Sequence, residues 1–202
     1  MDSLAPDIVL PRLRGRFGRP YRYAVETAST QQLLPLDAPE GAVAIAEHQT
    51  AGRGRLGRSW QAPPRSSVLL SIMLRPITPP AALPELSVVG AEAVADAITT
   101  VTGLEPAIKH PNDVLVDGRK VAGVLGEARE RAVILGIGIN TNIAAAELPT
   151  ETRLPATSLL AEAGRPVDRA ALAVELLVRL EQRYLAWLQG HEASALVDWQ
   201  RP

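Results

Sequence analysis

Residues 107–140 read AIKHPNDVLVDGRKVAGVLGEARERAVILGIGIN, a series of short apolar runs separated by turn-forming residues. We expect four strands in this stretch, over residues 107–110, 113–116, 121–129 and 132–139. The Asp117-Gly118 pair between the second and third runs is a typical hairpin turn. The stretch therefore predicts strands that are neighbours in one sheet.

The flanking sequence adds further strands and several helices. Compact apolar runs and short alternating runs predict strands over residues 21–25, 41–48 and 67–74. Helical spacing of apolar residues predicts helices over residues 86–101, 158–162 and 168–188. Ser29 is expected to cap another short helix, Asp168 to cap the last helix, and Gly190 to end it. Hairpins combined with crossover helices predict an α+β fold, a mixed β-sheet flanked by helices.

Composition limits the classes of protein that need to be considered. The chain has 202 residues, 47% of them hydrophobic, and a formal net charge of −1, which fits one sizeable domain and argues against a general nucleic-acid binder. It has no cysteine, which excludes disulfides and thiolate chemistry. No apolar run approaches membrane-spanning length and the N-terminus lacks a signal-peptide core, so we expect a cytoplasmic protein without a membrane partner.

The first twenty residues differ in character from the rest. Pro6, Pro11 and Pro20 are expected to break any helix there, and the arginines between them suit a solvated tail. We therefore expect residues 1–20 to be a loose N-terminal arm and residues 21–202 to be one domain.

A basic loop follows the strand expected at residues 41–48. Its sequence GRGRLGR, residues 52–58, alternates three arginines with three glycines. Glycine lets backbone amides approach a ligand, and arginine offers planar charge to phosphate or carboxylate, so we favour anion binding over a solvated basic loop. The string matches G-x-G-x-x-G, but Pro63 and Pro64 follow it where a dinucleotide-binding helix would have to run. A Walker loop is excluded because the chain contains no Gly-Lys-Ser/Thr.

Two lysines flank the expected hairpin. Lys109 opens the segment KHPND, residues 109–113, and Lys120 follows the Asp117-Gly118 turn, so that both could converge with Asn112 and Asp113 on one site. Lysines of this kind could neutralise phosphoryl oxygens and a substrate carboxylate. A surface hairpin with ordinary polar turn residues explains the pattern equally well.

Glycines also interrupt the last strand of the stretch. The segment GIGIN, residues 136–140, places two glycines in an apolar run. Such glycines mark the close approach of a ligand or, just as often, of another backbone.

Taken together, these segments closely resemble the biotin protein ligase family, whose fold is related to that of lipoate ligases and class II aminoacyl-tRNA synthetases. The matching segments are STQ at 29–31, QTAGRGRLGRSW at 49–60, KHPND at 109–113, GRKVAGVL at 118–125, GIGIN at 136–140 and, more weakly, ATSLL at 156–160. They fall in the order found in the family. The loop with its trailing tryptophan is the most specific of them.

The resemblance implies roles for individual residues. The implied biotin-binding residues are Ser29, Thr30, Gln31, Gln49, Gly52, Arg53, Gly54, Arg55, Lys120, Gly123, Leu125 and Gly138. The implied ATP-binding residues are Arg55, Arg58, Trp60, Lys109, Asn112, Lys120 and Asn140. Lys120, Arg55 and Asp113 are implied to be catalytic: Lys120 bridges the biotin carboxylate and the α-phosphate, Asp113 places it, and Arg55 neutralises phosphate. No residue is assigned as a metal ligand.

The implied activity is ligation. The enzyme would activate biotin with ATP to biotinyl-5′-AMP, with Mg²⁺ accompanying ATP, and would transfer biotin to a lysine of a biotin carboxyl carrier protein. A lipoate or octanoyl ligase of the same fold, or a non-catalytic binder of biotin or biotinyl-AMP, is the alternative. A homodimer is possible on the resemblance alone.

The chain departs from the family pattern in four respects. His110 replaces the usual tryptophan and Gln31 the usual asparagine. Only about twenty residues precede the expected domain, so we expect no helix-turn-helix domain and no DNA partner. The chain ends at Pro202, so we expect the family's small C-terminal β domain to be absent.

Overall fold

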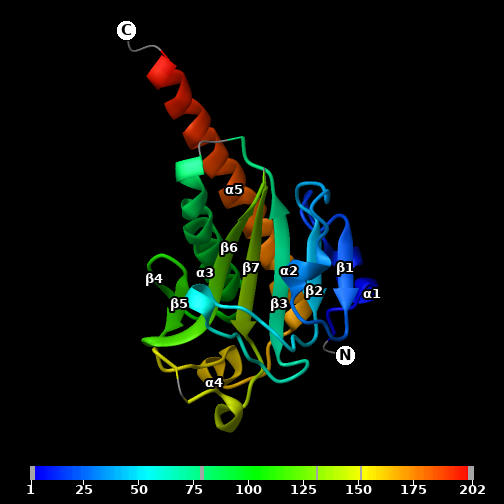
Figure 1. Cartoon of the computed structure of the whole chain (residues 1–202). Helices are drawn as coiled ribbons and strands as arrows, with labels where there is room; N and C mark the ends of the chain where they lie inside the picture. Colours follow the sequence, from blue (N-terminus) through cyan, green and yellow to red (C-terminus); the bar gives the residue numbers. More distant parts are fainter. Residues whose placement is uncertain (1–2, 78–79, 131, 151, 200–202) are drawn as a thin grey trace.

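A seven-stranded mixed sheet forms the centre of the molecule in the computed structural model (Figure 1). The structure describes residues 3–77, 80–130, 132–150 and 152–199. The strands are β1 (Tyr21–Ala24), β2 (Val43–Ala46), β3 (Ser67–Leu74), β4 (Ala107–Lys109), β5 (Asp113–Val116), β6 (Arg119–Arg129) and β7 (Ala132–Asn140). Their spatial order is β1-β2-β3-β7-β6-β5-β4, with β1 and β2 parallel and every other neighbouring pair antiparallel. The predicted α+β class, the mixed sheet and the four strands of residues 107–140 are thus confirmed.

Helices connect and cover the strands. The α-helices are α1 (Pro6–Val9), α2 (Thr30–Leu33), α3 (Leu86–Thr102), α4 (Leu159–Ala163) and α5 (Arg169–Trp199). Short 3-10 helices occur at η1 (Leu10–Arg12), η2 (Arg55–Gly57), η3 (Pro80–Glu85) and η4 (Ala145–Glu147). None of the helices in the described part of the chain is both long and apolar enough to cross a membrane.

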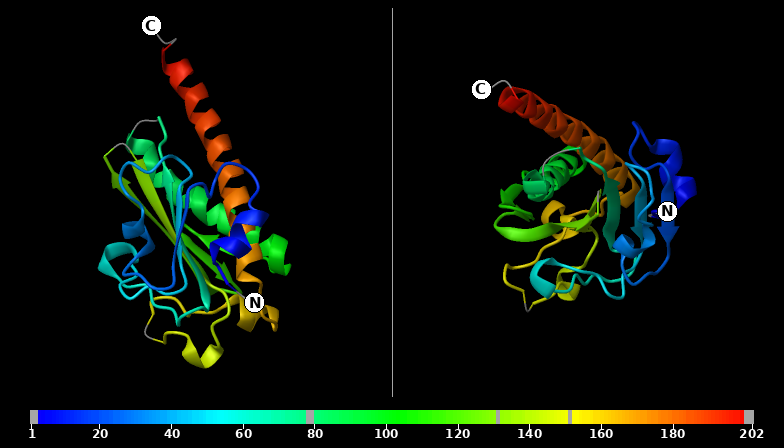
Figure 2. Two further views of the ribbon diagram at one scale, coloured as in Figure 1. Left: turned by 90° about the vertical axis from the view of Figure 1, so that its right-hand side faces the viewer. Right: turned by 45° about the horizontal axis from the view of Figure 1, so that its top comes forward.

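The two faces of the sheet serve different purposes. The long helices α3 and α5 lie side by side over one face, where Ile137 and Ile139 of β7 join the main apolar core (Figure 2). Alternation along a strand sends every second residue to the opposite face, so Gly136 and Gly138 point away from these helices. The second face is covered by α2 at one end and by the loop of residues 49–65 elsewhere, and this is where the candidate site lies.

The hairpin turn and the cap of α5 agree with the sequence. Asp117 and Gly118 both have positive φ, +48° and +75°, as the predicted type of tight turn requires. Asp168 accepts a hydrogen bond from the Ala171 amide at 3.0 Å, as an N-cap does. Burial alone would raise the pKa of Asp168, but the hydrogen bonds from Ala171 and Arg12 lower it below its usual value.

Two expectations about helices were wrong. Pro6 begins a short helix instead of preventing one, because proline is tolerated at the first helical position, where its missing amide costs no hydrogen bond. Gly190 does not end α5, which continues to Trp199. Glycine in a helix costs only about 1 kcal/mol relative to alanine, which is too little to stop a long helix by itself.

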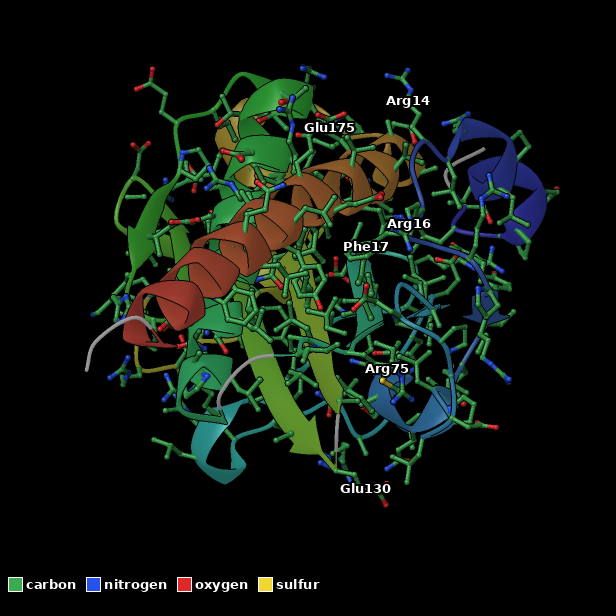
Figure 3. All side chains as sticks on the ribbon, turned by 90° about the horizontal axis from the view of Figure 1, so that it is seen from above. Arg14, Arg16, Phe17, Arg75, Glu130 and Glu175 are labelled. Carbon is green, nitrogen blue, oxygen red and sulfur yellow. The ribbon has the colours of Figure 1, made fainter. Side chains whose placement is uncertain are left out.

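The N-terminal segment is also not a loose arm over the part that the structure describes. Leu4, Val9, Leu13 and Phe17 are buried and belong to the main core. Phe17 packs against Tyr184 of α5 with ring centroids 5.8 Å apart, while Arg14 and Arg16, which precede it in the sequence, are exposed (Figure 3). The burial of these four apolar residues outweighed the prolines and arginines on which the prediction rested.

A buried ion pair connects the N-terminal segment to the sheet and to α5. Arg169 at the start of α5 and Glu47 after β2 are 0% and 2% exposed, and their Nη1 and Oε2 atoms are 2.7 Å apart. The other carboxylate oxygen of Glu47 accepts the Leu4 amide at 2.9 Å, and Arg169 donates to the Ser67 carbonyl at 3.2 Å. Burial, reinforced by the charge of Glu47, raises the pKa of the neighbouring Tyr21 hydroxyl. One pair therefore joins the N-terminal segment, two strands and α5.

Replacing Glu47 by alanine is expected to destabilise the protein by about 3–5 kcal/mol, because the guanidinium of Arg169 would keep its charge inside the core without its carboxylate. Urea unfolding followed by circular dichroism measures this change. Arg12→Ala, which removes the exposed pair with Asp168, should cost about 1 kcal/mol or less. Equal losses in the two variants would contradict a special role for the buried pair.

Candidate functional site

One cavity of about 400 Å³ opens on the sheet face opposite α3 and α5. Its walls come from α2, the loop of residues 49–65, strands β3, β5, β6 and β7, and the residues Pro149, Thr152, Arg153, Leu154 and Ala156. This volume is in the range of small-molecule sites, which are concave and combine apolar surface with a few placed polar groups. The cavity therefore defines the candidate site.

The floor of the cavity is a pair of facing glycines. Gly123 of β6 and Gly138 of β7 are cross-strand partners. A methyl group added at Gly138 would lie 2.5 Å from the ring of Trp60, and one added at Gly123 would lie 3.1 Å from it. The glycines thus leave a flat surface that accepts a planar group in contact with the backbone, and in this structure the indole of Trp60 lies there.

Polar side chains line one end of the cavity. Gln49 Oε1 accepts hydrogen bonds from the Thr30 amide at 2.7 Å and the Thr30 hydroxyl at 3.0 Å. The Thr30 hydroxyl also lies 2.7 Å from that of Ser71 on β3. Gln31 is 7% exposed and its Oε1 has no partner among the described residues, nor does Nε1 of Trp60. Buried polar atoms cost free energy when unpaired, so this end is suited to a ligand that brings its own donors and acceptors.

Positive charge gathers in another part of the cavity. Lys120 Nζ lies 2.5 Å from Asp113 Oδ1 and 5.5 Å from the centre of the Trp60 ring. Arg153 Nη2 is 3.7 Å from the other oxygen of Asp113. Asp113 is the single carboxylate among the described residues that line the cavity, so the cations there outnumber it. The excess charge is arranged to receive an anion.

The glycine–arginine loop folds over this region. Arg55 Nη1 donates to Asn112 Oδ1 at 3.0 Å, and Asn112 in turn donates to the Val124 carbonyl at 2.9 Å. At the other side of the loop, Arg53 pairs with Glu127 of β6 at 2.8 Å. The loop and the hairpin therefore lie on the same side of the sheet.

Most residues expected to form the site line the cavity. These are Ser29, Thr30, Gln31, Gln49, Arg53, Gly54, Arg55, Arg58, Trp60, Asn112, Asp113, Lys120, Gly123, Leu125, Gly138 and Asn140. Two do not line it. Lys109 is exposed on the edge strand β4, and Gly52 packs within the loop against the backbone of Trp60, whose carbonyl oxygen an added methyl group would meet at 2.4 Å. His110 is exposed next to Lys109 and is not among the lining residues either.

Sequence reasoning missed several lining residues. Ser71 stands in an apolar strand, where its alternation with Leu70 and Ile72 could have placed it on the cavity face. Thr152, Arg153 and Leu154 belong to a segment without regular structure, and no pattern in the sequence marks them.

Comparison with known proteins agrees with this geometry. Residues 23–143 match the biotin/lipoate A/B protein ligase family. The chain is 40% identical over 161 residues to the bifunctional ligase/repressor BirA of Bacillus subtilis, covering 77% of this chain and 50% of that protein. It is 42% identical over 160 residues to the biotin--[acetyl-CoA-carboxylase] ligase of Mycobacterium tuberculosis, covering 77% of this chain and 59% of that protein. The chain thus spans between half and three-fifths of the length of these relatives.

A solved structure extends the likeness to three dimensions. The biotin protein ligase from Aquifex aeolicus in complex with biotin and ATP superposes with a TM-score of 0.75 at 33% identity. The superposition covers 83% of this chain and 71% of that one.

Gly138→Ala is expected to displace the indole of Trp60 from the floor, because the added carbon would lie 2.5 Å from its ring. With Trp187 and Trp199 replaced by phenylalanine, the emission of Trp60 should move to longer wavelength as the ring becomes more exposed. Gly126→Ala is the matched control, since its added carbon would face Ser87 of α3 on the opposite side of the sheet. An unchanged spectrum in Gly138→Ala would contradict the described packing.

Proposed function

The chain belongs to the biotin/lipoate A/B protein ligase family, and from this premise we propose that it is a biotin protein ligase. It activates biotin with ATP and transfers the biotinyl group to a lysine of a carboxylase carrier protein. The observation that carries the proposal is the meeting of Arg55, Lys120 and Asp113 beside the glycine floor in one cavity.

Biotin fits the neutral half of the cavity. Its fused rings form a compact body that can lie over Gly123 and Gly138, in the place that the Trp60 ring now fills. Its ureido group offers two N–H donors and one carbonyl acceptor to Thr30, Gln31, Gln49 and Ser71. A lipoyl or octanoyl group offers no such atoms and would leave the buried Gln31 Oε1 without a partner, which favours biotin over them.

The charged half suits the reacting atoms. A carboxylate oxygen of biotin attacks the α-phosphorus of ATP and pyrophosphate leaves, which gives biotinyl-5′-AMP. Lys120 lies between the two substrates and neutralises the carboxylate and the α-phosphate, while Asp113 holds its ammonium group at 2.5 Å. Arg55 and Arg58 neutralise the negative charge of the phosphates. The cavity holds a single carboxylate among the described residues, so Mg²⁺ enters as the complex with ATP and is held mainly by phosphate oxygens.

Transfer follows from the same arrangement. The amine of the acceptor lysine attacks the acyl carbon of the adenylate, a new amide bond forms and AMP leaves with the electron pair of the broken bond. No protein nucleophile is needed, and catalysis comes from positioning and charge neutralisation. Arg153, although absent from the sequence motifs, lies close enough to Asp113 to join the cations of this half.

Incubation with ATP, radiolabelled biotin and a biotin carboxyl carrier domain tests the proposal. Label on the carrier lysine is the expected result. Biotin or biotinyl-AMP that binds without transfer would identify a non-catalytic binder, and transfer of lipoate in preference to biotin would overturn the assignment of substrate.

Lys120→Ala and Arg55→Ala are each expected to slow adenylate formation at least about 100-fold, because each removes a charge placed for the transition state. Pyrophosphate release measures this rate, and circular dichroism checks that the variants fold. Lys109→Ala is the matched lysine control and should change the rate less than about threefold, since Lys109 lies outside the cavity lining. Wild-type rates in Lys120→Ala would remove this lysine from the mechanism.

A further inference from the structure

The first residues of strand β6 have no pairing partner on the neighbouring strand β7. The first pair of the β6–β7 ladder is Ala122 with Ile139, so Lys120 lies beyond the end of that ladder. On its other side Lys120 pairs with Leu115 of β5, next to an irregularity in the register. A lysine at such a strand end would have its backbone fixed on one side only.

Residues 155–157 take the place that β7 leaves open. The Lys120 amide donates to the Pro155 carbonyl at 2.7 Å, and the Thr157 amide donates to the Lys120 carbonyl at 2.9 Å. Asn140, the last residue of β7, donates through its side chain to the Thr157 carbonyl at 3.0 Å. A short parallel bridge thus fixes the backbone of Lys120 on the side away from β5. The side chain of Asn140 connects this bridge to β7.

The carboxylate of Glu162 forms hydrogen bonds to both strands of this bridge. Glu162, in the first turn of α4, has a side chain that is 4% exposed. Its Oε2 accepts from Arg119 Nη2 at 2.7 Å, and its Oε1 accepts from the Thr157 hydroxyl. Arg119 precedes Lys120 directly on β6, and Thr157 follows Ala156, the partner of Lys120 across the bridge. Glu162 therefore holds one residue from each strand of the bridge next to Lys120, without lining the cavity.

We propose that Glu162 is a positioning residue for adenylation: it holds the bridge of residues 155–157 against β6 and so fixes where Lys120 meets the phosphate. The inference rests on the proposed function and deepens it, because it assigns a role to a residue outside the cavity. A displacement of about 1 Å at a reacting group can cost about 100-fold in rate, so a buried clamp two contacts away from the substrate has a measurable effect.

A double-mutant cycle on ligand affinity tests this without relying on turnover. The probe is a biotinyl-adenylate analogue with a sulfamate in place of the phosphate, and calorimetry measures its binding to wild type, Glu162→Ala, Lys120→Ala and the double variant. We expect Glu162→Ala to weaken the analogue about tenfold, comparable to the loss of one charge-assisted hydrogen bond, and to leave the affinity for biotin alone within about twofold. In the Lys120→Ala background the same change should cost less than about twofold, because the group it positions is gone.

Two further variants separate positioning from general stability. Glu162→Gln keeps one acceptor oxygen, which can receive the bond from Arg119 or the one from Thr157, and should restore part of the affinity; it also covers the case in which the alanine variant does not fold. Glu175→Ala removes another glutamate–arginine pair, the one with Arg179 on α5, and should leave analogue binding unchanged.

The outcomes distinguish the two proposals. Equal losses with and without Lys120, or equal losses for biotin and the analogue, would overturn the assignment of Glu162 while leaving the ligase intact. A wild-type protein that does not bind the analogue would overturn the proposed function, and the role of Glu162 with it.

Discussion

The close approach of a planar group to the backbone of β6 and β7 is the constraint on which the site depends. Side chains normally cover both faces of a sheet and keep a ligand away from the backbone, which limits the depth of a pocket on that face. Here the cross-strand pair Gly123 and Gly138 removes that cover at one point of the register. Antiparallel pairing of β6 with β7 brings the two glycines face to face, and a slip of either strand by one residue would turn its glycine toward the helices. The long β6–β7 ladder therefore serves the site as much as the fold.

The cavity is divided by charge, and the division orients what it binds. At one end Thr30 and Gln49 are neutral and partly bonded to one another, so they recognise a ligand through hydrogen bonds. In the other half Lys120 and Arg55 outnumber the one carboxylate, and each is held by a polar partner from the hairpin. A molecule with a neutral ring at one end and an acid at the other gains from one orientation only, because the reverse orientation would bury its charge among uncharged amides. The acid then lies where a phosphate is also favoured.

Local sequence features predicted the strands, the hairpin and the loop well, because each depends on residues close together in the chain. Apolar runs fix a strand, two residues fix a tight turn, and glycines alternating with arginines fix a flexible basic loop. The failures have the opposite origin. Pro6 and Gly190 disfavour helices locally, yet tertiary packing and the length of α5 decide the outcome there. Arg153 and Glu162 act through contacts with residues more than thirty positions away, and no short-range pattern reports such contacts.

Stability and function are separated across the sheet, and this separation has a physical reason. The face under α3 and α5 carries the continuous apolar core, and the buried pair of Glu47 and Arg169 has partners for its charges. The opposite face carries bare glycines and polar atoms of Gln31 and Trp60 without partners among the described residues. These features cost stability in the empty protein, since unpaired buried groups and glycine in strands are both unfavourable. A ligand that supplies the missing partners recovers that free energy on binding, and it stabilises the folded state in proportion to its own affinity. The helix-covered core thus provides the stability that offsets the unpaired groups on the second face.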